Sequence, residues 1–266
     1  LFFLWLWLSP GSSRGGWSAA SNVYKRTGNV IASMTDLAHH SVSEDDRSRY
    51  QRRLDLYIPI VKAWCSEMAQ EVTSLGVQVH GGMGFVEETG VAQYMRDARI
   101  LTIYEGTTGI QAIDLMGRKM WRDKGLGMGE LIAEMEGFER SMPDQLDEDK
   151  AEAFGRIKRE LARSLASLKE STEWFLAKAS DDPYLSGSIG VNYMMQAGNV
   201  IAGWLMARSA VSAQQHIDLG KSDAFYRNKI STALFFAEHI LPRSESLKIT
   251  VQSGSDSVMS IGIADF

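Results

Sequence analysis

Residues 78–85 have the sequence Gln-Val-His-Gly-Gly-Met-Gly-Phe, and these glycines interrupt a chain whose apolar residues otherwise recur at helical spacing. Glycine has no Cβ, so the backbone at Gly81, Gly82 and Gly84 can turn sharply and come close to a phosphate. The N–H groups at the start of a following helix would favour the same anion. A plain connection between two helices is the alternative, because no β-strand precedes the run, as a dinucleotide-binding fingerprint requires.

The segment before the glycines carries the pattern of one long helix. Its apolar residues fall at steps of three and four, which places them on one helical face. These residues are Tyr50, Leu54, Tyr57, Val61, Cys65, Met68, Val72, Leu75 and Val79. Ser43 is a suitable N-cap, and Asp46 at the third helical position gives a weaker form of the capping box. The sequence therefore predicts a helix that begins after Ser43 and continues to the glycines.

A lone carboxylate, Glu105, follows the glycines shortly before another predicted helix. We expect a short helix at 93–98 and then an extended approach over 101–104. Thr108 and Gln111 form a Thr-x-x-Gln capping box for the next helix. Glu105 would thus lie where backbone N–H groups converge. Taken alone, such a carboxylate is adequately explained by its attraction to the helix N-terminus, which is worth less than about 1 kcal/mol.

The remainder of the chain is also helical in pattern. Turn-forming residues punctuate it at 124–129 and 141–144. No segment alternates with the period of a β-strand, so the sequence predicts an all-α fold of helices packed into bundles. The expected later helices are 130–140, 147–180, 187–218, 222–241 and 245–261.

The composition is that of an ordinary globular protein, and it limits the partners. Of the 266 residues, 44% are hydrophobic and 23% are charged, with a net charge of -5. No basic face is visible, so nucleic acid is not an expected partner. The single cysteine, Cys65, cannot form an intramolecular disulfide and should pack as a small apolar residue. No metal site is expected, and the apolar residues 1–8 are too few to span a membrane.

Three motifs together resemble the C-terminal domain of the acyl-CoA dehydrogenases, FAD enzymes that oxidise the Cα–Cβ bond of an acyl-CoA thioester. They are the glycine run at 78–85, Arg-Asp-Ala-Arg-Ile at 96–100 and Tyr-Glu-Gly-Thr-Thr-Gly-Ile-Gln at 104–111. The resemblance implies that Glu105 is the base that removes the α-proton while hydride leaves Cβ for flavin N5. Arg96 and Asp97 are expected to form a structural ion pair or helix-end contacts.

The same resemblance implies which residues contact the cofactor and the substrate. The segment that would touch the FAD of a neighbouring subunit consists of Gln78, Val79, His80, Gly81 and Gly82. A second FAD contact would come from Thr107, Thr108 and Gly109. The substrate would be contacted by Tyr104 and Gly106, which flank Glu105.

The resemblance also divides the chain. Residues 1–28 match no part of the family, and residues 29–125 resemble part of its C-terminal helical domain. Residues 145–266 resemble a second helical bundle, which is appended in a larger bacterial subgroup that includes 3-methylmercaptopropionyl-CoA dehydrogenase-like enzymes. In the family, an N-terminal helical domain and a middle β-domain hold most flavin and CoA contacts. The chain alone is therefore expected to bind FAD poorly and to be inactive.

The implied partners are an acyl-CoA substrate, an electron-transferring flavoprotein as electron acceptor, and further copies of the chain in a dimer or tetramer. The implied compartment is the bacterial cytoplasm, or the mitochondrial matrix in a eukaryote. Two other interpretations stay open. An acyl-CoA oxidase would share Glu105 and FAD but pass electrons to oxygen. A non-catalytic helical assembly module would use the bundles without any chemistry.

Overall fold

The computed structural model describes residues 14–142, 148–221, 223–262 and 264. Every regular element in this part of the chain is a helix, which confirms the predicted all-α fold. Of the atypical start expected at residues 1–28, residues 1–13 lie outside the described residues, and helix begins at Arg14. The α-helices are α1 (Arg14–His40), α2 (Glu44–Val79), α3 (Gly82–Phe85), α4 (Val91–Arg99), α5 (Thr108–Ile113), α6 (Leu126–Ser141), α7 (Glu148–Lys178), α8 (Leu185–Asp218), α9 (Ala224–His239) and α10 (Arg243–Gln252).

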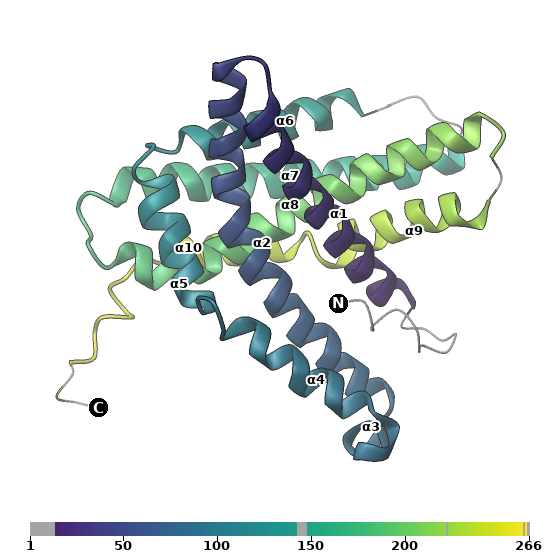
Figure 1. Cartoon of the computed structure of the whole chain (residues 1–266), viewed down its shortest axis with the longest axis horizontal. Helices are drawn as coiled ribbons and strands as arrows, with labels where there is room; N and C mark the ends of the chain where they lie inside the picture. The colour runs from purple at the N-terminus through teal and green to yellow at the C-terminus, as the bar shows by residue number, and fades with distance from the viewer. Residues whose placement is uncertain (1–13, 143–147, 222, 263, 265–266) are drawn as a thin grey trace.

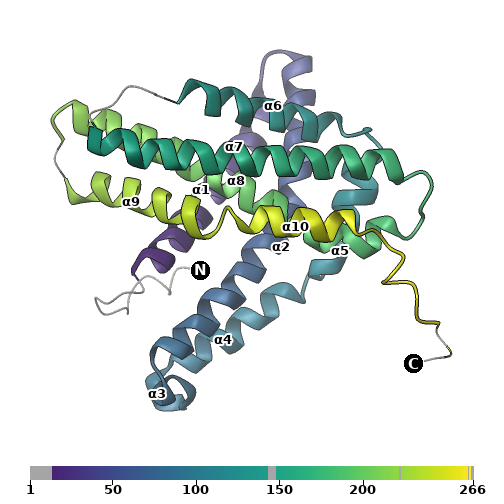
Figure 2. The same ribbon diagram turned by 180° about the vertical axis from the view of Figure 1, so that it is seen from behind.

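Helix α2 belongs to two parts of the molecule. It packs against α1, α6 and α8 within the body, and against α3 and α4 further along. Figure 1 shows the C-terminal part of α2 leaving the body side by side with α4, with α3 at the far end. We call this projection, formed by the C-terminal part of α2 with α3 and α4, the arm. Figure 2 shows α7, α9 and α10 across the other side of the body, around α8.

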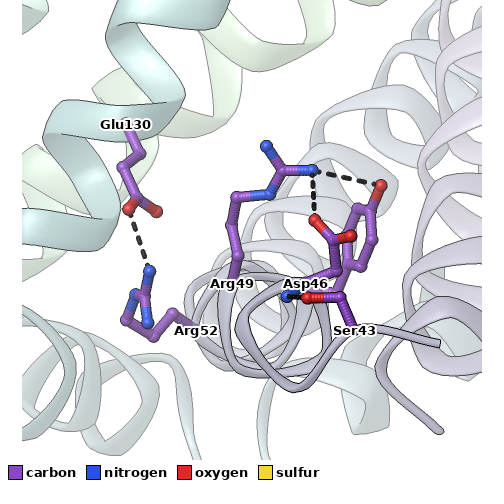
Figure 3. A network of polar contacts seen from close by, with 6 residues as sticks. Ser43, Asp46, Arg49, Arg52 and Glu130 are labelled. Atoms are coloured by element: carbon purple, nitrogen blue, oxygen red, sulfur yellow. Dashed lines mark hydrogen bonds and ion pairs between the residues drawn. The ribbon is translucent and has the colours of Figure 1, made fainter. Parts of the chain in front are cut away.

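Ser43 caps the start of α2 as the sequence predicts, but among the described residues the Asp46 side chain does not complete the capping box. The Ser43 hydroxyl accepts a hydrogen bond from the backbone N–H of Asp46 at 3.3 Å. Figure 3 shows this cap beside two ion pairs of α2. Arg49 pairs with Asp46 at 3.2 Å on the exposed surface, where such a pair contributes little. Arg52 pairs with Glu130 of α6 at 2.9 Å and so ties two helices together.

One continuous core joins the two halves of the sequence, because buried apolar residues from α2 and from α5 to α10 form a single cluster. Trp64 of α2 lies against α8 within it. Its indole Nε1 donates to Asn199 Oδ1 at 2.9 Å. A Cβ on Gly198 would lie 2.3 Å from the Trp64 ring, so only glycine permits this close approach. The first predicted segment is therefore packed directly on the second.

Several predicted boundaries differ from the structure. Helix α6 begins at Leu126 rather than at 130, within the segment 124–129 that was expected to be a turn. Helix α4 spans Val91–Arg99 and is longer than the predicted 93–98. The extended approach predicted at 101–104 is wrong, because Ile100–Thr102 form a 3₁₀ turn that continues α4. The last helix ends at Gln252 rather than 261, since Gly254 has φ +74 and its N–H bonds back to Val251 O, as in a glycine helix stop.

Cys65 lies in α2 against the core, as expected for a packing residue. Burial raises the pKa of its thiol from 9.0 to about 12, partly offset by a hydrogen bond with Thr27.

Because the thiolate is the reactive form, we expect a disulfide reagent at pH 8 to label Cys65 at least about 100-fold more slowly in folded than in urea-unfolded protein. The raised pKa also lowers stability above pH 9, where the unfolded thiol ionises first. Equal labelling rates would contradict the burial.

Candidate functional site

The two segments predicted to form the site lie far apart along the arm (Figure 1). Lys62 of α2 contacts the Glu105 turn, through Tyr104 O and Gly106 O at 2.8 Å. Gln78 lies 16 residues further along the same helix, which corresponds to about 24 Å at 1.5 Å per residue. Within one copy of the chain, the structure therefore does not bring the residues at 78–82 together with those at 104–109.

The glycine segment leaves part of its backbone open. Helix α2 ends at Val79, and Gly81 takes φ +58, a left-handed value that favours glycine. A Cβ on Gly81 or Gly82 would meet no atom of the described residues within 4 Å. The exposed Gln78 side chain makes no hydrogen bond within the part of the chain that the structure describes. Its amide donor and acceptor are thus available to a ligand.

Two other residues of this segment serve its fold. The His80 ring binds back to α2, with Nδ1 2.9 Å from Gly76 O. A Cβ on Gly84 would lie 2.2 Å from Val77 O, so glycine is required for α3 to fold back on α2. The expected attraction of an anion to the next helix is weak here, because α3 has only 4 residues and hence a small dipole.

Glu105 lies in a strained turn between α4 and α5. It is exposed, and its φ of +50 is uncommon for a residue with a Cβ, at a cost of about 1–2 kcal/mol. Within the described residues its carboxylate has no hydrogen bond or ion pair. Gly106 follows with φ +96, and a Cβ there would lie 2.6 Å from Gln111 Nε2. The turn thus presents a carboxylate that no residue in the described part of the chain pairs with, and it requires glycine at the next position.

The helix after this turn is capped one residue earlier than predicted. The N-cap of α5 is Thr107, whose hydroxyl accepts from the Ile110 N–H at 3.4 Å. Thr108 instead donates to Glu67 of α2 at 2.5 Å. Gln111, which was expected to complete the box, donates from Nε2 to Glu105 O at 3.4 Å. The predicted capping box is wrong. The cap lies one position earlier, at Thr107, because α2 supplies Thr108 with a tertiary partner.

Lys62 and Glu67 support the turn, and the sequence pattern did not reveal them. Lys62 Nζ also donates to Leu101 O at 3.0 Å and lies 5.3 Å from the centre of the Tyr104 ring. Both residues are half-buried on α2, and the sequence carries no local signal of that burial. Their partners follow about 40 residues later in the sequence, so no local spacing connects them.

Other predicted contact residues are accessible in the structure. Tyr104 is 45% exposed, and a Cβ on Gly109 would meet nothing within 4 Å among the described residues. Large apolar side chains are also exposed on the arm and its base, a feature of surfaces that contact other molecules. They are Leu75, Val79, Met83, Phe85, Tyr94, Met95, Ile100, Ile103 and Tyr104.

Arg96 has a structural role, as expected, but with a different partner. It pairs with Glu87 at 2.7 Å and links α4 to the 3₁₀ turn at Glu87–Thr89. Consecutive residues on a helix point in different directions, so Asp97 cannot face it. No group of three metal-binding side chains occurs in the described ranges. None of the helices placed by the structure has the length and apolar character needed to cross a membrane.

The chain matches two family models over most of its length. Residues 30–120 match "Acyl-CoA dehydrogenase, C-terminal domain", and residues 131–262 match "Acetyl-CoA dehydrogenase C-terminal like". Over 231 residues the sequence is 41% identical to 3-methylmercaptopropionyl-CoA dehydrogenase of Ruegeria pomeroyi. That alignment covers 86% of this chain and 38% of the relative, so the chain spans well under half of the relative's length.

Two solved structures share the helical arrangement. Caenorhabditis elegans ACDH-11 in complex with C11-CoA gives a TM-score of 0.62 at 21% identity, covering 85% of this chain and 35% of the other. An acyl-CoA dehydrogenase complexed with FAD from Bacillus anthracis gives 0.58 at 17% identity, covering 89% and 41%. At these identities the similarity shows the fold alone.

Proposed function

Because this chain belongs to the acyl-CoA dehydrogenase family, of which it spans the C-terminal portion, we propose that it is part of a dehydrogenase that oxidises an acyl-CoA thioester to the trans-2-enoyl-CoA. The activity is proposed for the protein that contains this chain, since the chain spans 38% of the relative's length. Within it, residues 29–125 and 145–266 are proposed as two helical units.

Glu105 carries the proposal as the base. The α-proton of a thioester is weakly acidic, so its removal needs a positioned acceptor within hydrogen-bond reach. Glu105 supplies an exposed carboxylate, and no described side chain neutralises it. FAD, when bound, would accept the hydride that leaves Cβ. Tyr104 and Gly106, which flank Glu105, are proposed to contact the acyl-CoA beside the reacting carbons.

The open backbone at the glycines suits contact with a flavin cofactor. The Gln78 amide has no hydrogen-bond partner among the described residues, and Gly81 and Gly82 have no Cβ to hold a ligand away. We assign Gln78, Val79, His80, Gly81 and Gly82 to the FAD of a neighbouring subunit, and Thr107, Thr108 and Gly109 to a second FAD contact.

A dimer or tetramer is part of the proposal. The separation of about 24 Å between the two segments supports their serving flavins in different subunits. The exposed apolar side chains of the arm support contact with another chain. An electron-transferring flavoprotein is the proposed electron acceptor, as the family resemblance implies.

The test uses the full-length protein that carries this chain. We expect the purified protein to bind flavin, and its visible absorbance to bleach when acyl-CoA is added without oxygen. Comparing 3-methylmercaptopropionyl-CoA with a straight-chain acyl-CoA of equal length would identify the substrate subgroup. Rapid hydrogen peroxide formation in air would indicate an oxidase. A colourless protein that acyl-CoA leaves unchanged would contradict the proposed function.

A further inference from the structure

Lys62 directs its side chain at backbone carbonyls around the Glu105 turn. Its Nζ donates to Tyr104 O and Gly106 O at 2.8 Å and to Leu101 O at 3.0 Å. A lysine ammonium has three N–H donors and no acceptor. The three carbonyls therefore use its whole donor capacity, which makes the contact specific to a tetrahedral cation. Lys62 comes from α2, so it fastens the turn to the long helix.

The turn depends on such support. Glu105 and Gly106 have successive left-handed φ values of +50 and +96. A strained backbone of this kind persists only where surrounding contacts over-determine it. The carbonyl on each side of Glu105 O is bonded to Lys62, while Glu105 O itself accepts from Gln111 at 3.4 Å. Lys62 supplies the two shorter of these bonds and the only cation in the group.

We infer that Lys62 is a positioning residue, which fixes the direction of the Glu105 carboxylate by holding the carbonyls on both sides of it. This inference rests on the proposed role of Glu105 as the base. The ammonium is directed at carbonyls, and within the described residues Lys62 forms no ion pair with Glu105. The carboxylate is thus held in place through its backbone while it stays free to accept a proton.

The activity test compares Lys62→Met with Lys119→Met in the full-length protein. Lys119 is also half-buried and contacts α2, through Asp55 at 3.5 Å, and so serves as a matched control. Because a base displaced by about 1 Å can lose about 100-fold in rate, we expect kcat of Lys62→Met to fall by about that factor. KM and flavin content should change less than about threefold, because most CoA and flavin contacts are expected to lie in the other domains of the full-length protein. Lys119→Met should keep its kcat.

Hydrogen exchange provides a readout that does not depend on catalysis. The N–H groups of Ile103 and Tyr104 both donate to Ile100 O at the entry of the turn. In Lys62→Met we expect these amides to exchange at least about tenfold faster, because the turn opens locally, while the body of α2 stays protected. Lys62→Arg keeps the charge but has a planar fork, so it should restore protection only in part. If Lys62→Met fails to fold, the amide protection of Ile103 and Tyr104 in Lys62→Arg tests the positioning role instead.

The outcomes separate the two proposals. If wild type bleaches with acyl-CoA while Lys62→Met keeps its kcat and its amide protection, the positioning role is wrong and the proposed function stands. An equal loss of kcat in Lys119→Met would also overturn the positioning role, because the effect would then be general. If none of the acyl-CoA substrates bleaches the flavin of the wild type, the proposed function fails. Hydrogen exchange alone then decides whether Lys62 holds the turn.

Discussion

Glu105→Gln is expected to slow flavin bleaching by acyl-CoA about 10²- to 10⁴-fold, the usual contribution of a general base. Glutamine has nearly the same size but cannot accept the α-proton. The Glu105 side chain is exposed and makes no hydrogen bond within the described residues, so the substitution should leave flavin content and melting temperature unchanged. Stopped-flow absorbance without oxygen measures the rate in the full-length protein.

The matched control is Glu173→Gln, which neutralises an exposed carboxylate on α7, far along the sequence from the turn. It should bleach at the wild-type rate. Full activity in Glu105→Gln would mean that the base lies elsewhere. If neither the wild type nor any variant bound flavin, the non-catalytic assembly module would become the better explanation.

Trp64→Ala is expected to lower the free energy of unfolding by about 3–5 kcal/mol, as for other large-to-small core substitutions. The indole is 2% exposed and fills the space that Gly198 leaves on α8. Its removal would also deprive Asn199 of a buried hydrogen bond, and an unsatisfied buried group adds a penalty. Urea unfolding followed by circular dichroism measures the loss.

Trp121→Ala is the control, because this tryptophan is 40% exposed and its loss should cost much less. The other buried residues of the core that α2 shares with α5 to α10 remain in this variant, so both halves should still unfold in one transition. Two separate transitions in Trp64→Ala would show instead that residues before and after 125–145 form independent cooperative units.

Local sequence was enough to predict most of the helices and the place of Glu105 before one of them. Apolar residues at steps of three and four predicted α2, and Ser43 was correctly identified as its cap. These features depend on neighbours within one or two turns, so they can be read from spacing. The position of Glu105 just before a helix was also predictable. Its role as the base remains a prediction, because it rests on the family resemblance and on chemistry that has yet to be tested.

Residue spacing and turn chemistry along the chain predicted most of the helices, the glycine turn after α2 and the carboxylate that precedes α5. Contacts between distant segments account for the rest. Packing against α2 lets the Thr108 hydroxyl donate to Glu67, and Thr107 therefore caps α5 instead. It also put Lys62 against the carbonyls beside Glu105, and the length of α2 separated the glycines from that turn. These contacts join residues about 40 positions apart or depend on helix length, and only the assembled helices bring such partners together or hold them apart.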